Sequence, residues 1–168
     1  MLFFLVVLTL LMLAAFYLDA TRYLIPNWLN TMVILLYVVF VLSSPVAIGW
    51  LSGIYAFILV FIVGFPIFFF RLMGGGDVKL LIALALWCGL SETLAEFVIY
   101  TGLLGGVLSV ALLSIRPFAA WLCAKSGKDI TIPKILTYGQ DIPYGLAITT
   151  AFLIVLWNGK VAGLPVKF

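Results

Sequence analysis

The most informative feature of this 168-residue chain is what it lacks, since it contains no histidine and only two cysteines. Cys88 and Cys123 lie far apart and form no C-x-x-C pair, so the usual zinc-binding patterns are absent. The absence of histidine also excludes nucleophile triads with an imidazole base and histidine proton relays. Any chemistry must therefore use carboxylates, amines or hydroxyls, and neither a metal nor another cofactor is expected.

Charged residues are equally scarce, at 9% of the chain, whereas 66% of the residues are apolar. A soluble domain carries about a quarter charged residues, so the composition predicts an integral membrane protein in contact with lipid. A net charge of +3 would suggest nucleic-acid binding in a soluble protein. In a membrane protein the few basic residues are better explained by orientation in the bilayer, and no nucleic-acid partner is expected.

Long apolar runs dominate what is present. A helix that crosses a hydrocarbon core of ~30 Å needs roughly 20 apolar residues, and the runs are divided by "SSPVAIG" and by short polar segments. The sequence predicts an all-α, polytopic protein with a single domain over residues 1–168. Six transmembrane helices are expected at about 2–18, 28–43, 50–70, 78–90, 96–115 and 143–158.

The distribution of basic residues predicts an orientation with both termini outside. That arrangement makes the segments 19–27, 71–79 and 116–142 cytoplasmic, the last of them as a long loop along the membrane surface. These segments hold seven of the nine basic residues, namely Arg22, Arg71, Lys79, Arg116, Lys125, Lys128 and Lys134. Such a bias is the positive-inside signal of membrane proteins.

Three of the six acidic residues stand at predicted cytoplasmic helix ends: Asp19, Asp77 and Asp141. Ionisable groups at membrane depth are costly and are usually functional. Glu92 and Glu96 fall in a predicted outside loop, and the sixth acid, in the long loop, stands among lysines. These other three acids are expected to be ordinary solvated residues.

Asp77 has two interpretations in the stretch "RLMGGGDVKLL". It can act as the N-cap of the fourth helix, but a cap does not require three preceding glycines. Consecutive glycines permit positive φ and close approach of another chain, so Gly74 and Gly76 favour a loop that admits a substrate backbone. Asp19 either pairs with Arg22 as a simple interfacial acid or takes part in chemistry, because the end of a helix disfavours a negative charge.

Taken together, Asp19 and Asp77 point to an acid–base pair at one membrane face. Two carboxylates held close share a proton, because the first charge opposes the second ionisation. One then activates water and the other protonates the carbonyl, as in aspartic proteases. From a different class, a small ion or proton-coupled transporter would use the same acids, but it would need a polar path across the bilayer.

Three segments carry a family resemblance: "DATRYLIPN" (19–27), "GGGDVKLL" (74–81) and "DIPYGLAI" (141–148). In this order on six helices they resemble the signatures of the type IV prepilin peptidases, intramembrane aspartyl proteases of the G-x-G-D class. The resemblance implies Asp19 and Asp77 as the catalytic pair. The residues it implies for loop and cleft shaping are Gly74, Gly76, Lys79, Pro26, Asn27, Pro143, Tyr144 and Gly145, while Asp141 is assigned only to the entry of the sixth helix.

The chain departs from long members of that family, which carry an N-terminal zinc domain with paired C-x-x-C motifs and methylate the new N-terminus. No such domain and no methylation are expected here. The length is similar to the short enzymes of tight-adherence (Flp) pilus systems, which the resemblance says cleave prepilins and pilin-like proteins after a glycine. Archaeal preflagellin peptidases, which share the dyad, are the alternative within the class.

The resemblance also implies a partner and a location. The substrate would be a prepilin with a short basic leader followed by a hydrophobic helix, cut at the cytoplasmic face of the bacterial inner membrane. The sequence does not indicate which pilin is cut or how many copies of the chain associate.

Overall fold

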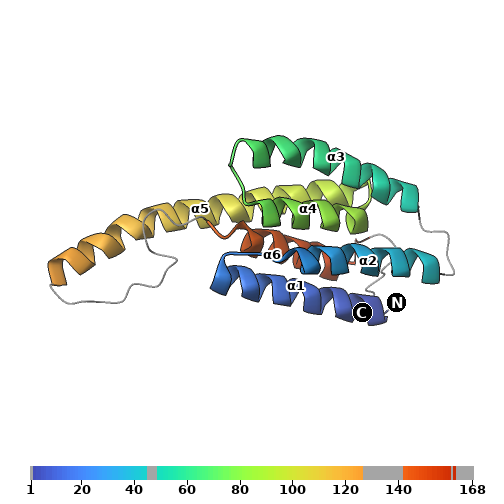
Figure 1. Ribbon diagram of the computed structural model, residues 1–168, viewed down its shortest axis with the longest axis horizontal. Coiled ribbons are helices and arrows are strands. Elements are labelled where there is room, and N and C mark those ends of the chain that lie inside the picture. Colours follow the sequence, from blue (N-terminus) through green and yellow to red (C-terminus); the bar gives the residue numbers. More distant parts are fainter. Residues whose placement is uncertain (1, 45–48, 127–141, 160, 162–168) are drawn as a thin grey trace.

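The computed structural model describes residues 2–44, 49–126, 142–159 and 161 of the chain. Asp141, Lys128 and Lys134 lie outside these residues, so the predictions made for them have no structural counterpart. Within the described part the chain is all-α, with six helices (Figure 1). They are α1 (Leu2–Arg22), α2 (Asn27–Ser43), α3 (Trp50–Phe69), α4 (Gly75–Cys88), α5 (Glu92–Ser126) and α6 (Tyr144–Trp157).

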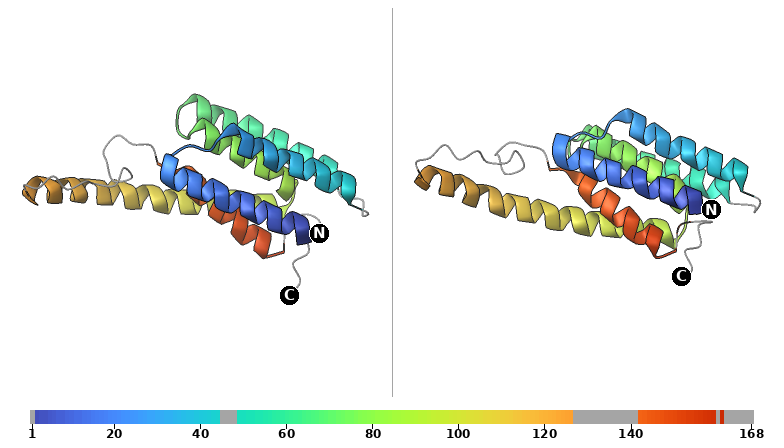
Figure 2. Two further views of the ribbon diagram at one scale, coloured as in Figure 1. Left: turned by 60° about the horizontal axis from the view of Figure 1, so that its bottom comes forward. Right: turned by 90° about the horizontal axis from the view of Figure 1, so that it is seen from below.

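The six predicted helices are confirmed, but two predicted loops are wrong. α5 continues without a break to Ser126 and has Pro117 inside it, so the first part of the predicted loop 116–142 is helical. Its 35 residues extend about 52 Å at ~1.5 Å per residue, and the helix projects beyond the other five (Figures 1 and 2). Glu92 and Glu96 belong to the first turns of α5 and not to a loop.

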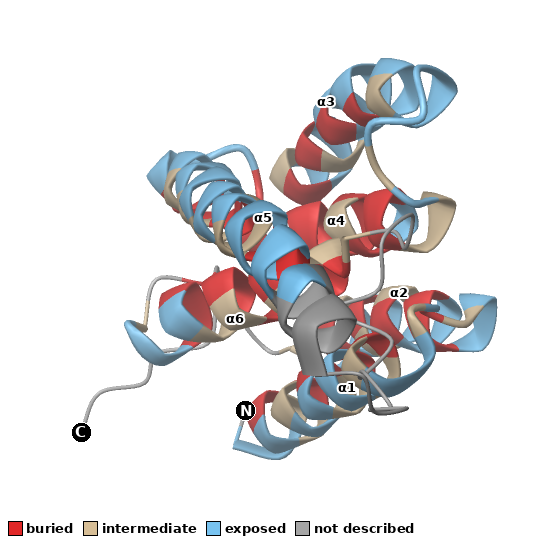
Figure 3. Ribbon diagram, turned by 90° about the vertical axis from the view of Figure 1, so that its left-hand side faces the viewer, coloured by how far each residue is buried: buried red, intermediate tan, exposed pale blue. Residues whose placement is uncertain are grey.

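The short helix α4 lies at the centre of the bundle and packs against α2, α3, α5 and α6. Every residue from Ile82 to Cys88 is buried, and Figure 3 shows buried residues on several sides of this helix. A helix that is apolar all round is expected in such a position. Trp87 anchors α2 to it, because its indole N–H donates to the Val33 carbonyl at 3.2 Å and its ring stacks on Phe40 at 5.3 Å.

In the part of the chain that the structure describes, three helical segments are long and apolar enough to cross a membrane: Leu2–Arg22, Trp50–Phe69 and Glu92–Phe118. Their outward faces carry exposed large apolar side chains such as Phe3, Ile62 and Leu103. A soluble protein rarely presents so much apolar surface, whereas a membrane protein places it against lipid. The structure therefore supports a membrane protein, in agreement with the composition.

One end of the bundle collects the features that the sequence singled out. α1 and α3 end there, and α2, α4 and α6 begin there (Figures 1 and 2). Asp19 lies near the end of α1 and Asp77 near the beginning of α4. The alternation of helix directions thus brings the two acids to the same end of the molecule, as predicted.

Candidate active site

Asp19 lies in the last turn of α1, and this helix ends at Arg22, about one turn beyond the end expected at residue 18. The helix continues through Arg22 and stops at Tyr23, which has a φ of 54° and donates its N–H to the Asp19 carbonyl at 3.1 Å. This left-handed residue with one backbone bond is a common helix termination. The side chain of Asp19 is only 3% exposed.

The carboxylate of Asp19 faces the beginning of α6. Its Oδ2 accepts the Leu146 N–H at 3.1 Å, and Gly145 lies against the same carboxylate. A helix N-terminus offers free N–H groups and a positive dipole end, so it stabilises an anion. The described partner of Asp19 is therefore α6, and not Arg22 as the simple interfacial interpretation supposed.

Gly145 makes this contact sterically feasible. A β-carbon at this position would lie 2.6 Å from Asp19 Oδ2 and 2.7 Å from Ile25 Cδ1. Real β-carbons do not approach other atoms so closely, so any side chain here would displace the carboxylate. The structure thus gives a physical reason for a glycine at this predicted site position: the missing side chain leaves room for the Asp19 carboxylate.

Asp77 occupies the third position of α4 and is 7% exposed. The N-cap is Gly74, with extended backbone (φ −61°, ψ 144°), so the alternative interpretation of Asp77 as the N-cap residue is wrong. A carboxylate in the first turn still benefits from the positive end of the helix dipole. Its Oδ2 folds back toward the cap, since a β-carbon on Gly74 would be 3.0 Å from that oxygen.

The three glycines before Asp77 do not form the positive-φ loop that the sequence suggested. Gly75 and Gly76 belong to α4, and the positive-φ glycines of the described chain are Gly89 and Gly159. The glycines serve close packing instead. A β-carbon on Gly76 would lie 3.0 Å from the Ile25 carbonyl oxygen, and one on Gly75 would lie 3.0 Å from the Phe68 ring.

Ile25 connects the two acid-bearing regions. It is almost fully buried in the link between α1 and α2, and its backbone and side chain lie against Gly76 at the beginning of α4. Its Cδ1 lies against Gly145 at the beginning of α6, beside the Asp19 carboxylate. The first turns of α4 and α6 therefore meet the same residue, with Asp77 on one helix and the partner of Asp19 on the other.

Lys79 and Asn27 pair with each other. Lys79 Nζ donates to Asn27 Oδ1 at 2.9 Å, which ties the first turns of α4 and α2 together. Pro26 is the N-cap residue of α2, with a φ of −69° and a ψ of 146°, and thus begins that helix in the extended conformation suited to a helix start. Lys79 was expected to shape the loop and the cleft, and its described contact joins the beginning of α4 to the beginning of α2.

Asn30 is a site residue that the sequence analysis missed. It is 5% exposed, its Nδ2 lies 3.4 Å from the Gly76 carbonyl, and its Oδ1 has no partner. A buried polar atom without a hydrogen bond is uncommon in proteins. The signal in the sequence was a second amide side chain, one turn after Asn27, in a helix that is mostly apolar.

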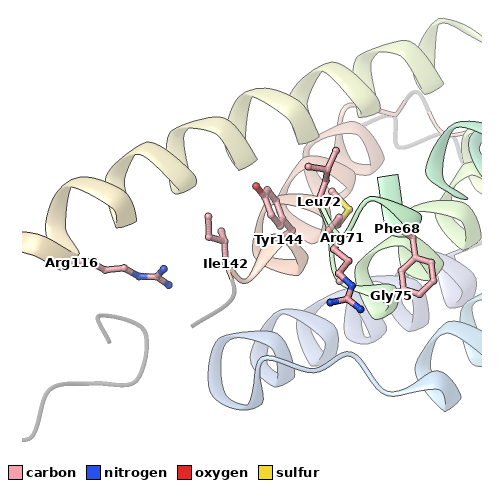
Figure 4. Close-up of a pocket in the computed structure, with 9 residues that line it drawn as sticks. Phe68, Arg71, Leu72, Gly75, Arg116, Ile142 and Tyr144 are labelled. Atoms are coloured by element: carbon pink, nitrogen blue, oxygen red, sulfur yellow. The ribbon is translucent and has the colours of Figure 1, made fainter. Parts of the chain in front are cut away.

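A cleft of about 490 Å³ opens beside the glycines, and Figure 4 shows side chains of α3, α5 and the beginning of α6 around it. Arg71 and Arg116 bring positive charge to its wall. Tyr144 also lines it, and its hydroxyl accepts a hydrogen bond from Ser109 at 3.2 Å. Pro143 is buried and is the N-cap residue of α6, directly before Tyr144.

The described residues contain no group of three histidine, cysteine, aspartate or glutamate side chains that could hold a metal ion.

Comparison with known families gives a match to the Type IV leader peptidase family over residues 6–110. The matched segment covers more than half of the chain and includes both Asp19 and Asp77, whereas α6 lies beyond it. No curated protein and no solved structure matches this chain.

Proposed function

Because this chain belongs to the type IV leader peptidase family and is an aspartic prepilin peptidase, we propose that Asp19 and Asp77 are its catalytic pair. One carboxylate takes a proton from water as the water oxygen attacks the scissile carbonyl carbon. The other gives its proton to the carbonyl oxygen and, after the C–N bond breaks, a proton reaches the leaving amine. Family membership favours this peptidase chemistry over the transporter alternative.

A single observation carries the proposal of the pair: the first turns of α4 and α6 both pack on Ile25, one bearing Asp77 and the other bonded to Asp19. Each carboxylate is buried beside a helix N-terminus, where a negative charge is stabilised without a metal or a histidine. This environment suits an acid that must remain ionised while its partner carries the shared proton.

For the substrate, we propose a prepilin of the Flp type, with a short basic leader before a hydrophobic helix. The short chain resembles the enzymes of tight-adherence systems, while archaeal-type preflagellin remains the alternative substrate. Arg22 and Arg71 lie at the same end of the bundle as the acids, which favours a cytoplasmic position for this end. The termini would then lie outside, and cleavage would occur on the cytoplasmic side, where the leader of the prepilin lies.

Purified enzyme in proteoliposomes, mixed with a synthetic Flp-type prepilin, tests the pair and the substrate together. Asp19→Asn and Asp77→Asn should each reduce turnover by about 10³-fold or more, with no loss of insertion or thermal stability. Glu92→Gln, an exposed acid of α5 at the other end of the bundle, is the matched control and should cut normally. Near-normal turnover of either aspartate variant would remove that residue from the pair, and preference for a preflagellin would replace the proposed substrate.

The proposed orientation has its own test, in cells and in a background lacking both native cysteines. A cysteine at exposed position 72, beside the glycines, should react with a membrane-impermeant reagent only after the cytoplasmic side is opened. One at exposed position 90, in the α4–α5 connection, should react in intact cells. The reverse labelling would place the acids on the wrong side for a leader that never crosses the membrane.

A further inference from the structure

A groove runs between α2 and α3 along the length of the bundle. Two cavities of about 330 and 420 Å³ lie end to end there, and both are lined by Ile34 of α2 and Phe57 of α3. Ile82 and Leu86 of α4 contribute to the lining of one cavity each. α2 and α3 both pack on α4, which therefore forms the floor between two helical walls.

One face of α2 lines the groove. The lining residues run from Asn27 to Leu42 at steps of three and four, which is the spacing of one helix face. They cover about 22 Å at ~1.5 Å per residue. This distance is most of a bilayer core of ~30 Å. The lining positions of α2 are 27, 30, 31, 34, 37, 38, 41 and 42.

The chemistry of the groove changes along its length. Its end nearest the acids carries the polar side chains of Asn27, Asn30, Thr31 and Lys79, whereas the remainder is lined almost wholly by apolar side chains. The polar end adjoins the candidate active site directly, because Asn30 bonds to the Gly76 carbonyl, one residue before Asp77. The unpartnered Oδ1 of Asn30 leaves this end with a hydrogen-bond acceptor that is not satisfied.

We propose that this groove seats the hydrophobic helix of the prepilin, which rests on the function proposed above. An apolar helix that fills a groove with this spacing buries its side chains in the manner of helix-in-groove recognition. Its end would lie at the polar mouth, where the chain must leave helical form to expose a peptide bond. That peptide bond would lie beside the segment that carries Asp77, because Asn30 at the polar end of the groove bonds to the Gly76 carbonyl.

A second apolar groove, between α3 and α5, provides the comparison. It is lined by residues such as Leu59 and Val63 of α3 and Val98 of α5, and its lining includes no acidic residue. A helix seated there would have no polar mouth beside Asp77. The two grooves flank the same helix α3, so one helix can report on both.

Photocrosslinking from α3 distinguishes the two grooves. A photoreactive phenylalanine analogue at Ile54 or Phe61, which line the α2–α3 groove, should couple to the prepilin helix in the uncleaving Asp77→Asn background. The same analogue at Leu59 or Val63 should not. Coupling from the second pair, equal coupling from both, coupling to lipid, or coupling to a second copy of the peptidase would overturn the proposal.

Steady-state kinetics give an independent readout. Val38→Trp adds bulk at the groove wall and should raise KM about tenfold with little change in kcat. Val39→Trp is the matched control, since Val39 does not line the groove and the two valines are similarly exposed, at 45% and 50%. Equal KM values would exclude the groove as the helix site. If the unmodified enzyme cuts no prepilin at all, the proposed function fails instead.

Discussion

Asp19 and Asp77 each lie at the N-terminus of a helix, but only for Asp77 does that helix belong to the same stretch of sequence. Asp77 lies in the first turn of its own helix, next to the glycine that caps it. Asp19 lies near the end of α1 and reaches the first turn of another helix, where it bonds to Leu146 and fits against Gly145. Both carboxylates thus sit at a helix N-terminus beside a residue without a β-carbon.

The difference between them concerns what holds each acid in place. The position of Asp77 follows from local structure, since it requires only that α4 begin at Gly75. The position of Asp19 depends on α1 and α6 packing together, through a bond between residues 127 positions apart in the sequence. Substitutions that disturb the contact between α1 and α6 should therefore displace Asp19, and lower turnover, more than local substitutions in α4 displace Asp77.

Gly145→Ala should give the largest effect of a substitution that leaves both acids present. Its β-carbon would lie 2.6 Å from Asp19 Oδ2, so the carboxylate or the helix must move. A misplacement of about 1 Å at a catalytic group can cost a hundredfold in rate, and we expect kcat to fall at least about that much in a prepilin cleavage assay. Gly102→Ala, which has nothing within 4 Å of its added carbon, is the control. Normal turnover of Gly145→Ala would show that Asp19 does not need this contact.

Gly76→Ala and Gly75→Ala sharpen the comparison on the Asp77 side. The new carbon at Gly76 would meet the Ile25 backbone oxygen, which cannot move without the α1–α2 link, whereas at Gly75 it would meet the ring of Phe68. Phe68 is half-exposed and can rotate away. We expect turnover to fall about tenfold for Gly76→Ala and less than about threefold for Gly75→Ala, with little change in thermal stability, because alanine also favours the helix by ~1 kcal/mol.

Equal losses at these two glycines would mean that the substrate, and not Ile25, senses the added methyl groups. The measurement is kcat and KM for each variant against one prepilin. A rise in KM alone would point to substrate contact, and a fall in kcat alone would point to displacement of Asp77.

The same contrast explains what the sequence could predict. The six helices and the meeting of both acids at one end follow from apolar run lengths and from alternating helix directions, which are local properties and simple topology. Asp77 beside a glycine segment is likewise visible in consecutive residues. The bond from Leu146 to Asp19 and the role of Gly145 depend on how α1 packs on α6, and no local pattern specifies that contact.

The glycine segment also shows that one sequence pattern can be explained by the wrong physical cause. Three glycines in a row indicate conformational freedom as well as close approach, and the sequence does not separate the two. In the structure the backbone of Gly75 and Gly76 is helical, and contacts with Phe68 and Ile25 account for the missing side chains.

Lys79 offers a test with a smaller expected effect, which asks whether the contact between α4 and α2 influences Asp77. Its hydrogen bond to Asn27 is exposed, and such a bond contributes only about 0.5–1.5 kcal/mol. We expect Lys79→Gln and Asn27→Ala each to lower turnover about two- to fivefold, and the double variant to be no worse than either single one. Losses that multiply in the double variant would show that Lys79 acts on the acids or the substrate directly, apart from Asn27.

The smallest effects are expected at the two residues that end the helices next to the acids. Tyr23 follows α1 with a φ of 54°, and Arg71 follows α3 with a φ of 56°. At Arg71 the Leu72 N–H bonds to the Ile67 carbonyl at 3.0 Å and the Arg71 N–H to that of Phe68 at 2.9 Å, the pattern that glycine usually completes.

A left-handed residue with a β-carbon costs roughly 1 kcal/mol more than glycine in this position. Arg71→Gly should therefore be more stable than Arg71→Ala by about that amount, since both variants lose the side chain and only one relieves the backbone. The pair Tyr23→Gly and Tyr23→Ala should differ in the same direction, and thermal unfolding in detergent measures both differences. A difference at Tyr23 without one at Arg71 would contradict the expectation for Arg71, and it would show that the link beside Asp19 is the more rigidly held of the two.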